Sequence, residues 1–193
     1  MIITGCNFKF NNLGKKEFDV GIYNEELTER EKLFLSIGND KSIVFKYNLK
    51  DQFNKIIIWS EKYKKGNLIL NDIGRTEVLI NDSGLVVITL SDPITSDTDK
   101  CIANIFIGNE IEYSKTKFPY RIEENSLSDI MKVFSVNSFK DNSIKDENIL
   151  GYIGYSKGDV IETISEEFYK NNDISLLKDY DSAYIIKCKF VKE

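Results

Sequence analysis

One stretch decides the fold class: residues 77–90 read EVLINDSGLVVITL. Two apolar, largely β-branched segments flank the turn-forming residues Asn81-Asp82-Ser83-Gly84, and this pattern is typical of a β-hairpin. A second hairpin is predicted where residues 101–107 and 110–113 flank Gly108-Asn109. Strands joined by short turns favour a largely antiparallel sheet over a doubly wound parallel one.

The remaining periodicity predicts more strands and several helices. Further strands are expected at residues 2–10, 18–23, 42–47, 149–155 and 183–191. Helices are expected at residues 25–36, between Asn48 and Gly66, at 126–134 and at 159–170. This order predicts an α+β fold: a mostly antiparallel sheet built from hairpins, with three or four helices packed on it.

Length and composition predict one domain over residues 1–193. Apolar residues make up 41% of the chain and aromatic residues 12%, which is enough for a sizeable core. The polar stretch at residues 135–148 is the candidate for a boundary or a long loop.

The chain contains no histidine, and this narrows its chemistry. Histidine is the commonest general base and metal ligand at neutral pH, so Ser-His-Asp, Cys-His and His-ligated metal sites are excluded. The formal net charge of -5 argues against nucleic acid as a partner, because phosphate neutralisation needs a basic face. We therefore expect no enzyme activity, no cofactor and no bound metal.

The cysteines predict a reducing compartment. Cys6, Cys101 and Cys188 are odd in number and far apart, each lies in or beside an apolar run, and there is no CxxC spacing. Buried, reduced thiols in a cytoplasmic protein are expected. No apolar run approaches the length of a membrane span, so we expect a soluble protein with no membrane partner.

A turn between a predicted strand and a predicted helix is one candidate for chemistry. Residues 151–159 read GYIGYSKGD, but the glycine spacing matches neither the Walker pattern nor GxGxxG. Asp159 would also occupy the helix N-terminus that a phosphate needs. The segment between Gly151 and Asp159 is interpreted as a capped turn, and a small enzyme or ligand-binding site using carboxylate and Lys groups there is the alternative.

Acidic residues gather in two neighbouring segments. Asp92, Asp97 and Asp99 share a loop without the pattern of an EF-hand, and Glu110 and Glu112 alternate onto one face of a predicted strand. The Glu-x-Glu lacks the other elements of an ADP-ribosyltransferase. These five residues are therefore predicted to form an acidic, partner-facing surface.

Residues 48–118 contain three features in a recognisable order. They are a predicted helix that carries Trp59 and ends at Gly66, a strand at 86–91 followed by Asp92-Pro93, and the hairpin at 105–113. This middle part resembles immunity proteins of bacterial contact-dependent growth inhibition and related polymorphic toxin systems. The resemblance implies a cytoplasmic protein that binds one cognate toxin domain, such as a basic nuclease, and blocks its active site. A phage or plasmid accessory protein is a further alternative.

Overall fold

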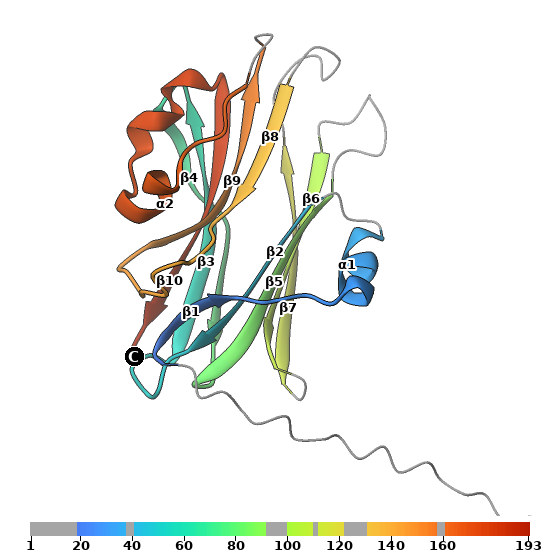
Figure 1. Ribbon diagram of the computed structural model, residues 1–193, viewed down its shortest axis with the longest axis vertical. Helices are drawn as coiled ribbons and strands as arrows, with labels where there is room; N and C mark the ends of the chain where they lie inside the picture. Colours follow the sequence, from blue (N-terminus) through green and yellow to red (C-terminus); the bar gives the residue numbers. More distant parts are fainter. Residues whose placement is uncertain (1–18, 38–40, 92–99, 110–111, 122–130, 158–160) are drawn as a thin grey trace, which may run out of the picture.

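Two antiparallel sheets of five strands face each other in the computed structural model, which describes residues 19–37, 41–91, 100–109, 112–121, 131–157 and 161–193 (Figure 1). Sheet A has the order β1-β2-β5-β6-β7, with β1 at Gly21–Asn24, β2 at Lys41–Asn48, β5 at Ser83–Ser91, β6 at Lys100–Gly108 and β7 at Tyr113–Arg121. Sheet B has the order β4-β3-β10-β9-β8, with β4 at Asn67–Leu79, β3 at Lys55–Lys64, β10 at Ser182–Val191, β9 at Asn148–Ser156 and β8 at Met131–Val136.

The main core lies between the two sheets. Successive side chains of a strand point to opposite faces, so alternate apolar residues of each strand meet in the middle. In β2 the buried residues are Ile43, Phe45 and Tyr47, and they pack with inward residues of sheet B such as Ile186 and Phe190. The predicted antiparallel sheet is confirmed, and it is divided into two facing layers.

The predicted hairpin at residues 77–90 is wrong in its pairing, although both of its strands form. β4 pairs with β3, whereas β5 pairs with β2 and β6. The turn after β4 therefore carries the chain from sheet B to sheet A. Turn residues encode a local reversal of direction, and the partner of each strand is set by contacts that are distant in sequence. The pairing of the second predicted hairpin is confirmed, since β6 pairs with β7, but its second strand is Tyr113–Arg121 instead of residues 110–113.

The predicted helix between Asn48 and Gly66 is wrong. Residues 55–64 form β3, and Lys65 and Gly66 have the left-handed backbone (φ 50° and 77°) of a tight turn into β4. β3 is buried on both faces, so its apolar residues do not alternate. A continuous apolar run such as Ile56-Ile57-Ile58-Trp59 cannot be assigned to helix or strand by periodicity.

Two further helix predictions need correction, and one is confirmed. Residues 131–136 form β8 instead of the end of a helix, and α2 is a short helix at Glu166–Asn171. Residues 161–165 before α2 are not helical, and the other residues of both predictions (126–130 and 159–160) lie outside the described residues. The first helix is confirmed as α1 at Glu29–Ser36, where Thr28 and Glu31 form a capping box.

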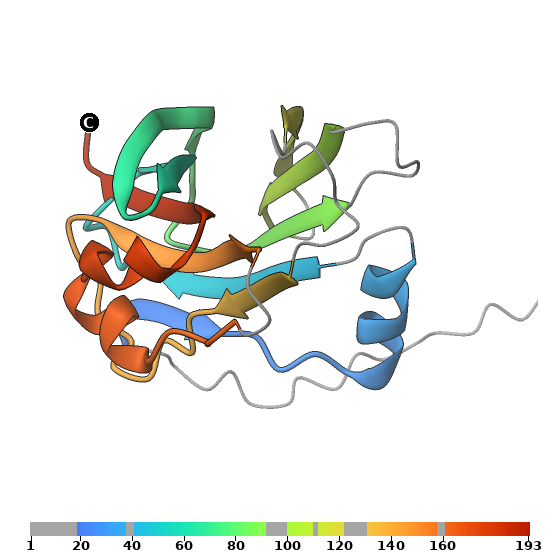
Figure 2. The ribbon, with the colours of Figure 1, turned by 90° about the horizontal axis from the view of Figure 1, so that it is seen from above.

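The prediction of three or four helices packed on the sheet is an overstatement. In the described part of the chain, α2 and the 3-10 helix η2 (Ile174–Asp179) cover the outer face of sheet B, and their Phe168 and Leu177 are fully buried. α1 has no buried residue and stands apart from both sheets (Figures 1 and 2).

The stretch predicted as a boundary or long loop is a loop that packs on the core. After β8, the loop at residues 137–147 inserts Phe139 beside Phe45, with ring centroids 5.6 Å apart. The predicted strand at 2–10 lies outside the described residues. Among the described helices, none is long and apolar enough to cross a membrane.

Candidate functional site

A hollow of about 330 Å³ opens at one end of the sandwich, where several connections between strands meet. We call it the hairpin-end hollow; it is lined by Tyr47, Val78, Leu79, Ile80, Asn81, Ser83, Ile107, Gly108, Asn109, Glu112, Tyr113 and Ser114. The lining comes from both sheets and from the β4–β5 and β6–β7 connections. Such loops on a rigid sandwich are where binding residues are commonly carried.

Two large apolar side chains stand exposed at this hollow. Leu79 is 69% exposed and Tyr113 is 63% exposed. The Tyr113 ring stacks on the Phe106 ring with centroids 4.9 Å apart, so its orientation is fixed by sheet A. An ordered aromatic ring beside an aliphatic side chain is the composition of an anchor in protein interfaces.

Glu112 adds a carboxylate to the same hollow. The loop that holds it is closed by two hydrogen bonds: the Glu112 N–H donates to Asn109 Oδ1 (2.9 Å) and the Asn109 N–H donates to the Glu112 carbonyl (2.8 Å). The Glu112 side chain is exposed. The hollow therefore offers apolar contact and a negative charge to one ligand.

Of the five residues predicted to bind a partner, Glu112 is the one in the described part of the chain. It lies in the loop before β7, whereas the sequence predicted a strand at that position. Asp92, Asp97, Asp99 and Glu110 lie outside the described residues. The strand ends that flank residues 92–99 are Ser91, which pairs with Ile102, and Lys100. They lie six and eight residues along β6 from Gly108, about 20 and 26 Å at 3.3 Å per residue.

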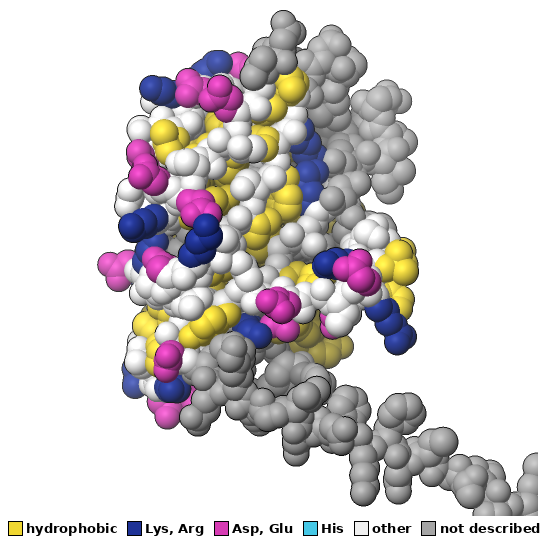
Figure 3. All heavy atoms as spheres, in the orientation of Figure 1, with side chains coloured by type: hydrophobic (Ala, Val, Ile, Leu, Met, Phe, Trp, Pro, Cys, Tyr) yellow, Lys and Arg dark blue, Asp and Glu magenta, His cyan; other side chains and the backbone are white. Residues whose placement is uncertain are grey.

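On one face of the molecule, charge by itself does not mark a site among the described residues. On the face seen in Figure 3, acidic and basic side chains are interspersed over the described residues. The sequence led us to choose carboxylates as the candidate binding residues, and it did not single out Leu79 and Tyr113. Their signal was weak, because apolar residues at the ends of predicted strands are ordinarily assigned to the core.

A second gathering of polar groups lies on the outer face of sheet B, around Glu61. Trp59 Nε1 donates to Glu61 Oε1 (3.1 Å), while Tyr63 OH (2.6 Å) and Lys187 Nζ (2.9 Å) approach Oε2. Lys187 also contacts Glu147 at 3.1 Å. Residues 59, 61 and 63 share one face of β3, and Lys187 lies opposite Trp59 in β10.

These contacts set the ionisation of Glu61. Burial raises its pKa, but hydrogen bonds from Tyr63, Lys187 and Trp59 outweigh burial and bring the pKa below its usual value. Burial and the neighbouring Glu61 raise the pKa of Tyr63. An ionised carboxylate with both oxygens engaged is a poor general base, and its geometry is that of an internal structural ion pair.

The segment between Gly151 and Asp159 differs from the predicted turn. Gly151 and Gly154 lie inside the buried strand β9, where a Cβ on Gly154 would stand 2.3 Å from the Tyr180 ring. These glycines allow close packing. Tyr152 and Tyr155 of the same strand are 0% and 1% exposed, so neither ring is available to a partner. Asp159 lies outside the described residues.

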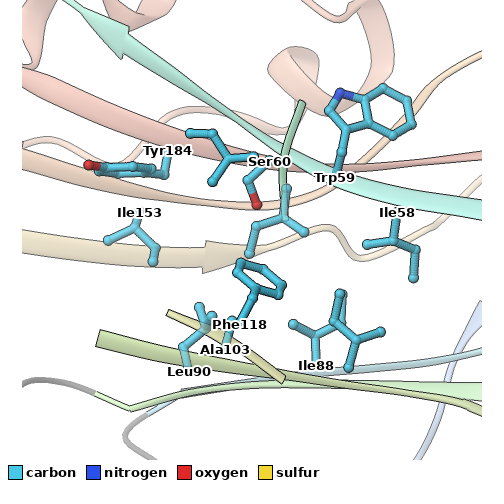
Figure 4. Close-up of a pocket in the computed structure, with 12 residues that line it drawn as sticks. Ile58, Trp59, Ser60, Ile88, Leu90, Ala103, Phe118, Ile153 and Tyr184 are labelled. Atoms are coloured by element: carbon cyan, nitrogen blue, oxygen red, sulfur yellow. The ribbon is translucent and has the colours of Figure 1, made fainter. Parts of the chain in front are cut away.

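A small space lies in the core between the two sheets, shown in Figure 4. It has a volume of about 20 Å³ and lies between Ile88, Leu90, Ala103 and Phe118 on one side and Ile58, Ser60, Ile153 and Tyr184 on the other. This is room for about one water-sized group, and its lining is mostly apolar, with Ser60 as a polar member. Within the described residues, no three acidic or Cys side chains converge on a common point for a metal. Cys188 is buried and free, and burial raises the pKa of its thiol.

A comparison with protein families assigns the chain to a family. A family model described as the YgaN domain matches residues 21–190, from the first residue of β1 into β10. The chain belongs to the YgaN domain family. The YgaN domain thus includes both sheets, the hairpin-end hollow and the Glu61 ion pair. No curated protein and no solved structure matches the chain.

Proposed function

We propose that this YgaN domain is a non-catalytic binding domain whose protein partner docks at the hairpin-end hollow. The observation that carries the proposal is the exposure of Leu79 and Tyr113 beside Glu112 in one hollow. Neighbouring exposed apolar side chains with a polar rim are typical of protein interaction sites. The engaged carboxylate of Glu61 supports a non-catalytic role.

The charge of the chain favours a basic partner. The net charge of -5 and the carboxylate of Glu112 would attract a positively charged protein and speed its encounter. Once docked, Leu79 and Tyr113 would hold the partner by excluding water from the hollow.

The specific partner that we propose is a basic toxin domain, such as a nuclease, neutralised in the cytoplasm. This step rests on the acidic charge and on the sequence resemblance to immunity proteins. The helix carrying Trp59, which was part of that resemblance, is replaced by β3 and β4. The strand at 86–91 and the hairpin at 105–113 are the parts that remain.

The test measures binding to the protein encoded by the gene next to the one that encodes this chain. If the chain is an immunity protein, that neighbouring gene is expected to encode the toxin. We expect Tyr113→Ala and Leu79→Ala each to weaken affinity about tenfold to a hundredfold, which corresponds to about 1.4–2.8 kcal/mol. Met131→Ala is the matched control, because Met131 is an exposed apolar residue (37%) on the edge strand β8. Glu112→Gln is expected to slow association and to reduce its salt dependence while changing dissociation less.

Two results would contradict the proposal. Affinity that is unchanged in both Tyr113→Ala and Leu79→Ala would remove the hollow as the interface. If the chain binds that protein but does not protect cells that express it, the chain is still a binding domain, but toxin neutralisation is rejected.

A further inference from the structure

In the described part of the chain, the two sheets have four edge strands, and three of them carry features that block pairing. β1 has four residues, and its Ile22 N–H donates to the Asn142 carbonyl (3.1 Å). β7 carries Lys115, Lys117 and Pro119, and β8 is a six-residue strand carrying Lys132. Short length, lysines and proline are the usual means of blocking edge-to-edge association.

The first half of the fourth edge, β4, is bulged but carries exposed apolar side chains, and its second half is distorted at a glycine. There the backbone at Gly74 is left-handed (φ 64°), and the Phe118 ring of β7 lies directly against it. In the first half, Leu68, Ile69 and Leu70 are 51%, 51% and 48% exposed. The register between β3 and β4 shifts here, since Leu70 pairs with Lys62 and Leu68 with Tyr63, which leaves Ile69 as the extra residue of a bulge.

The exposed half of β4 is self-complementary in sequence. Residues 67–71 read NLILN, which is the same in both directions. Two antiparallel copies with Ile69 opposite Ile69 would place Leu68 against Leu70 and Asn67 against Asn71. A two-fold contact requires one patch to match itself in this way.

The charges that flank this run are complementary under the same symmetry. Lys64 and Lys65 precede the run, and Asp72 follows it. In the antiparallel arrangement Lys64 of one copy would lie near Asp72 of the other, at both ends of the contact. Within each chain Asp72 also pairs with Arg75 (3.0 Å) and Lys65 pairs with Asp181 (2.8 Å). We propose that the occupant of this edge is a second copy of the chain, held by the Asn67–Asn71 segments of β4 about a two-fold axis at Ile69.

The test is sedimentation equilibrium of the full chain over a wide concentration range. The contact is small, so we expect weak dimerisation, with a dissociation constant of about 10–100 μM. Ile69→Lys would place two ammonium groups at the axis and weaken dimerisation at least about tenfold. Met131→Lys is the matched control, because Met131 is an exposed apolar residue (37%) on another edge strand, β8, and the substitution should leave dimerisation unchanged.

A second variant reports the symmetry. Cross-strand neighbours have Cβ atoms about 4.5–5.5 Å apart, so Ile69→Cys should form a disulfide-linked dimer on mild oxidation, whereas Met131→Cys should not. A chain that is monomeric throughout the range overturns the proposal, and so does dimerisation that Ile69→Lys leaves unaltered. Thermal unfolding of Ile69→Lys close to wild type would show that the exposed substitution leaves the fold intact.

Discussion

At the scale of single residues, Glu61 joins the polar contacts on the outer face of sheet B. Glu61→Gln keeps the size of the side chain and removes its charge, so Lys187 would keep only Glu147 as an anionic partner among the described contacts. We expect a loss of about 2–3 kcal/mol in the free energy of unfolding at pH 7, because Glu61 is buried and its hydrogen bonds are charge-assisted. Urea denaturation followed by circular dichroism measures this loss.

The same substitution has a defined pH dependence. The pKa of Glu61 is below its usual value of 4.5 in the folded protein, so its stabilising effect is complete above that value and is lost as pH falls through the folded pKa. The difference between wild type and Glu61→Gln should therefore be constant near neutrality and shrink in acid. Glu167→Gln, at an exposed position of α2, is the control without such a difference. A difference that persists undiminished to about pH 2 would reject the charged role of Glu61.

At the scale of elements, the bend of β4 over Phe118 joins the edges of the two sheets. A Cβ on Gly74 would lie 2.3 Å from the Phe118 ring, and the left-handed backbone there disfavours any side chain. We expect Gly74→Ala to destabilise the protein by about 2–4 kcal/mol, and by about 1 kcal/mol in a Phe118→Ala background where only backbone strain remains. Denaturation of the two single variants and the double variant measures this coupling, and equal costs in both backgrounds would refute it.

The errors in predicting elements share one physical cause. β3 was read as a helix because its inner face packs in the core while its outer face holds Trp59 and Tyr63, so alternation is lost. β8 was read as the end of a helix because Met131 and Phe134 are also spaced as on a helix face. α1 was predicted from a short charged segment, residues 25–36, and its actual start at Glu29 is set by a capping box that acts within four residues of chain.

At the scale of the whole molecule, the chain crosses repeatedly between the sheets. β2 leads into β3 and β4 leads into β5, each from one sheet to the other, and the main core draws on both. We expect one cooperative unfolding transition. Hydrogen exchange in increasing urea should bring amides of β5 and β9 to the same global free energy of opening. Sheet A amides that exchange through a separate, less stable opening would contradict this.

The candidate site shows the same division between local and distant information. The acidic balance, the absence of histidine and most strand segments follow from composition and local pattern, because each strand needs only alternating or continuous apolar residues and a turn. Leu79, Glu112 and Tyr113 are up to 34 positions apart, and they meet only because β4 and β7 come from different sheets that end at the same place.

The sequence by itself determined an antiparallel, hairpin-rich chain with α1 and a histidine-free chemistry, since these depend on residue type and on neighbours within a few positions. The tertiary structure alone decided that β4 and β5 part into different sheets, that residues 55–64 form a strand, and that Leu79 and Tyr113 stay exposed. The physical reason is that strand pairing and burial are stabilised by contacts between residues far apart in sequence, and one local pattern satisfies several such arrangements.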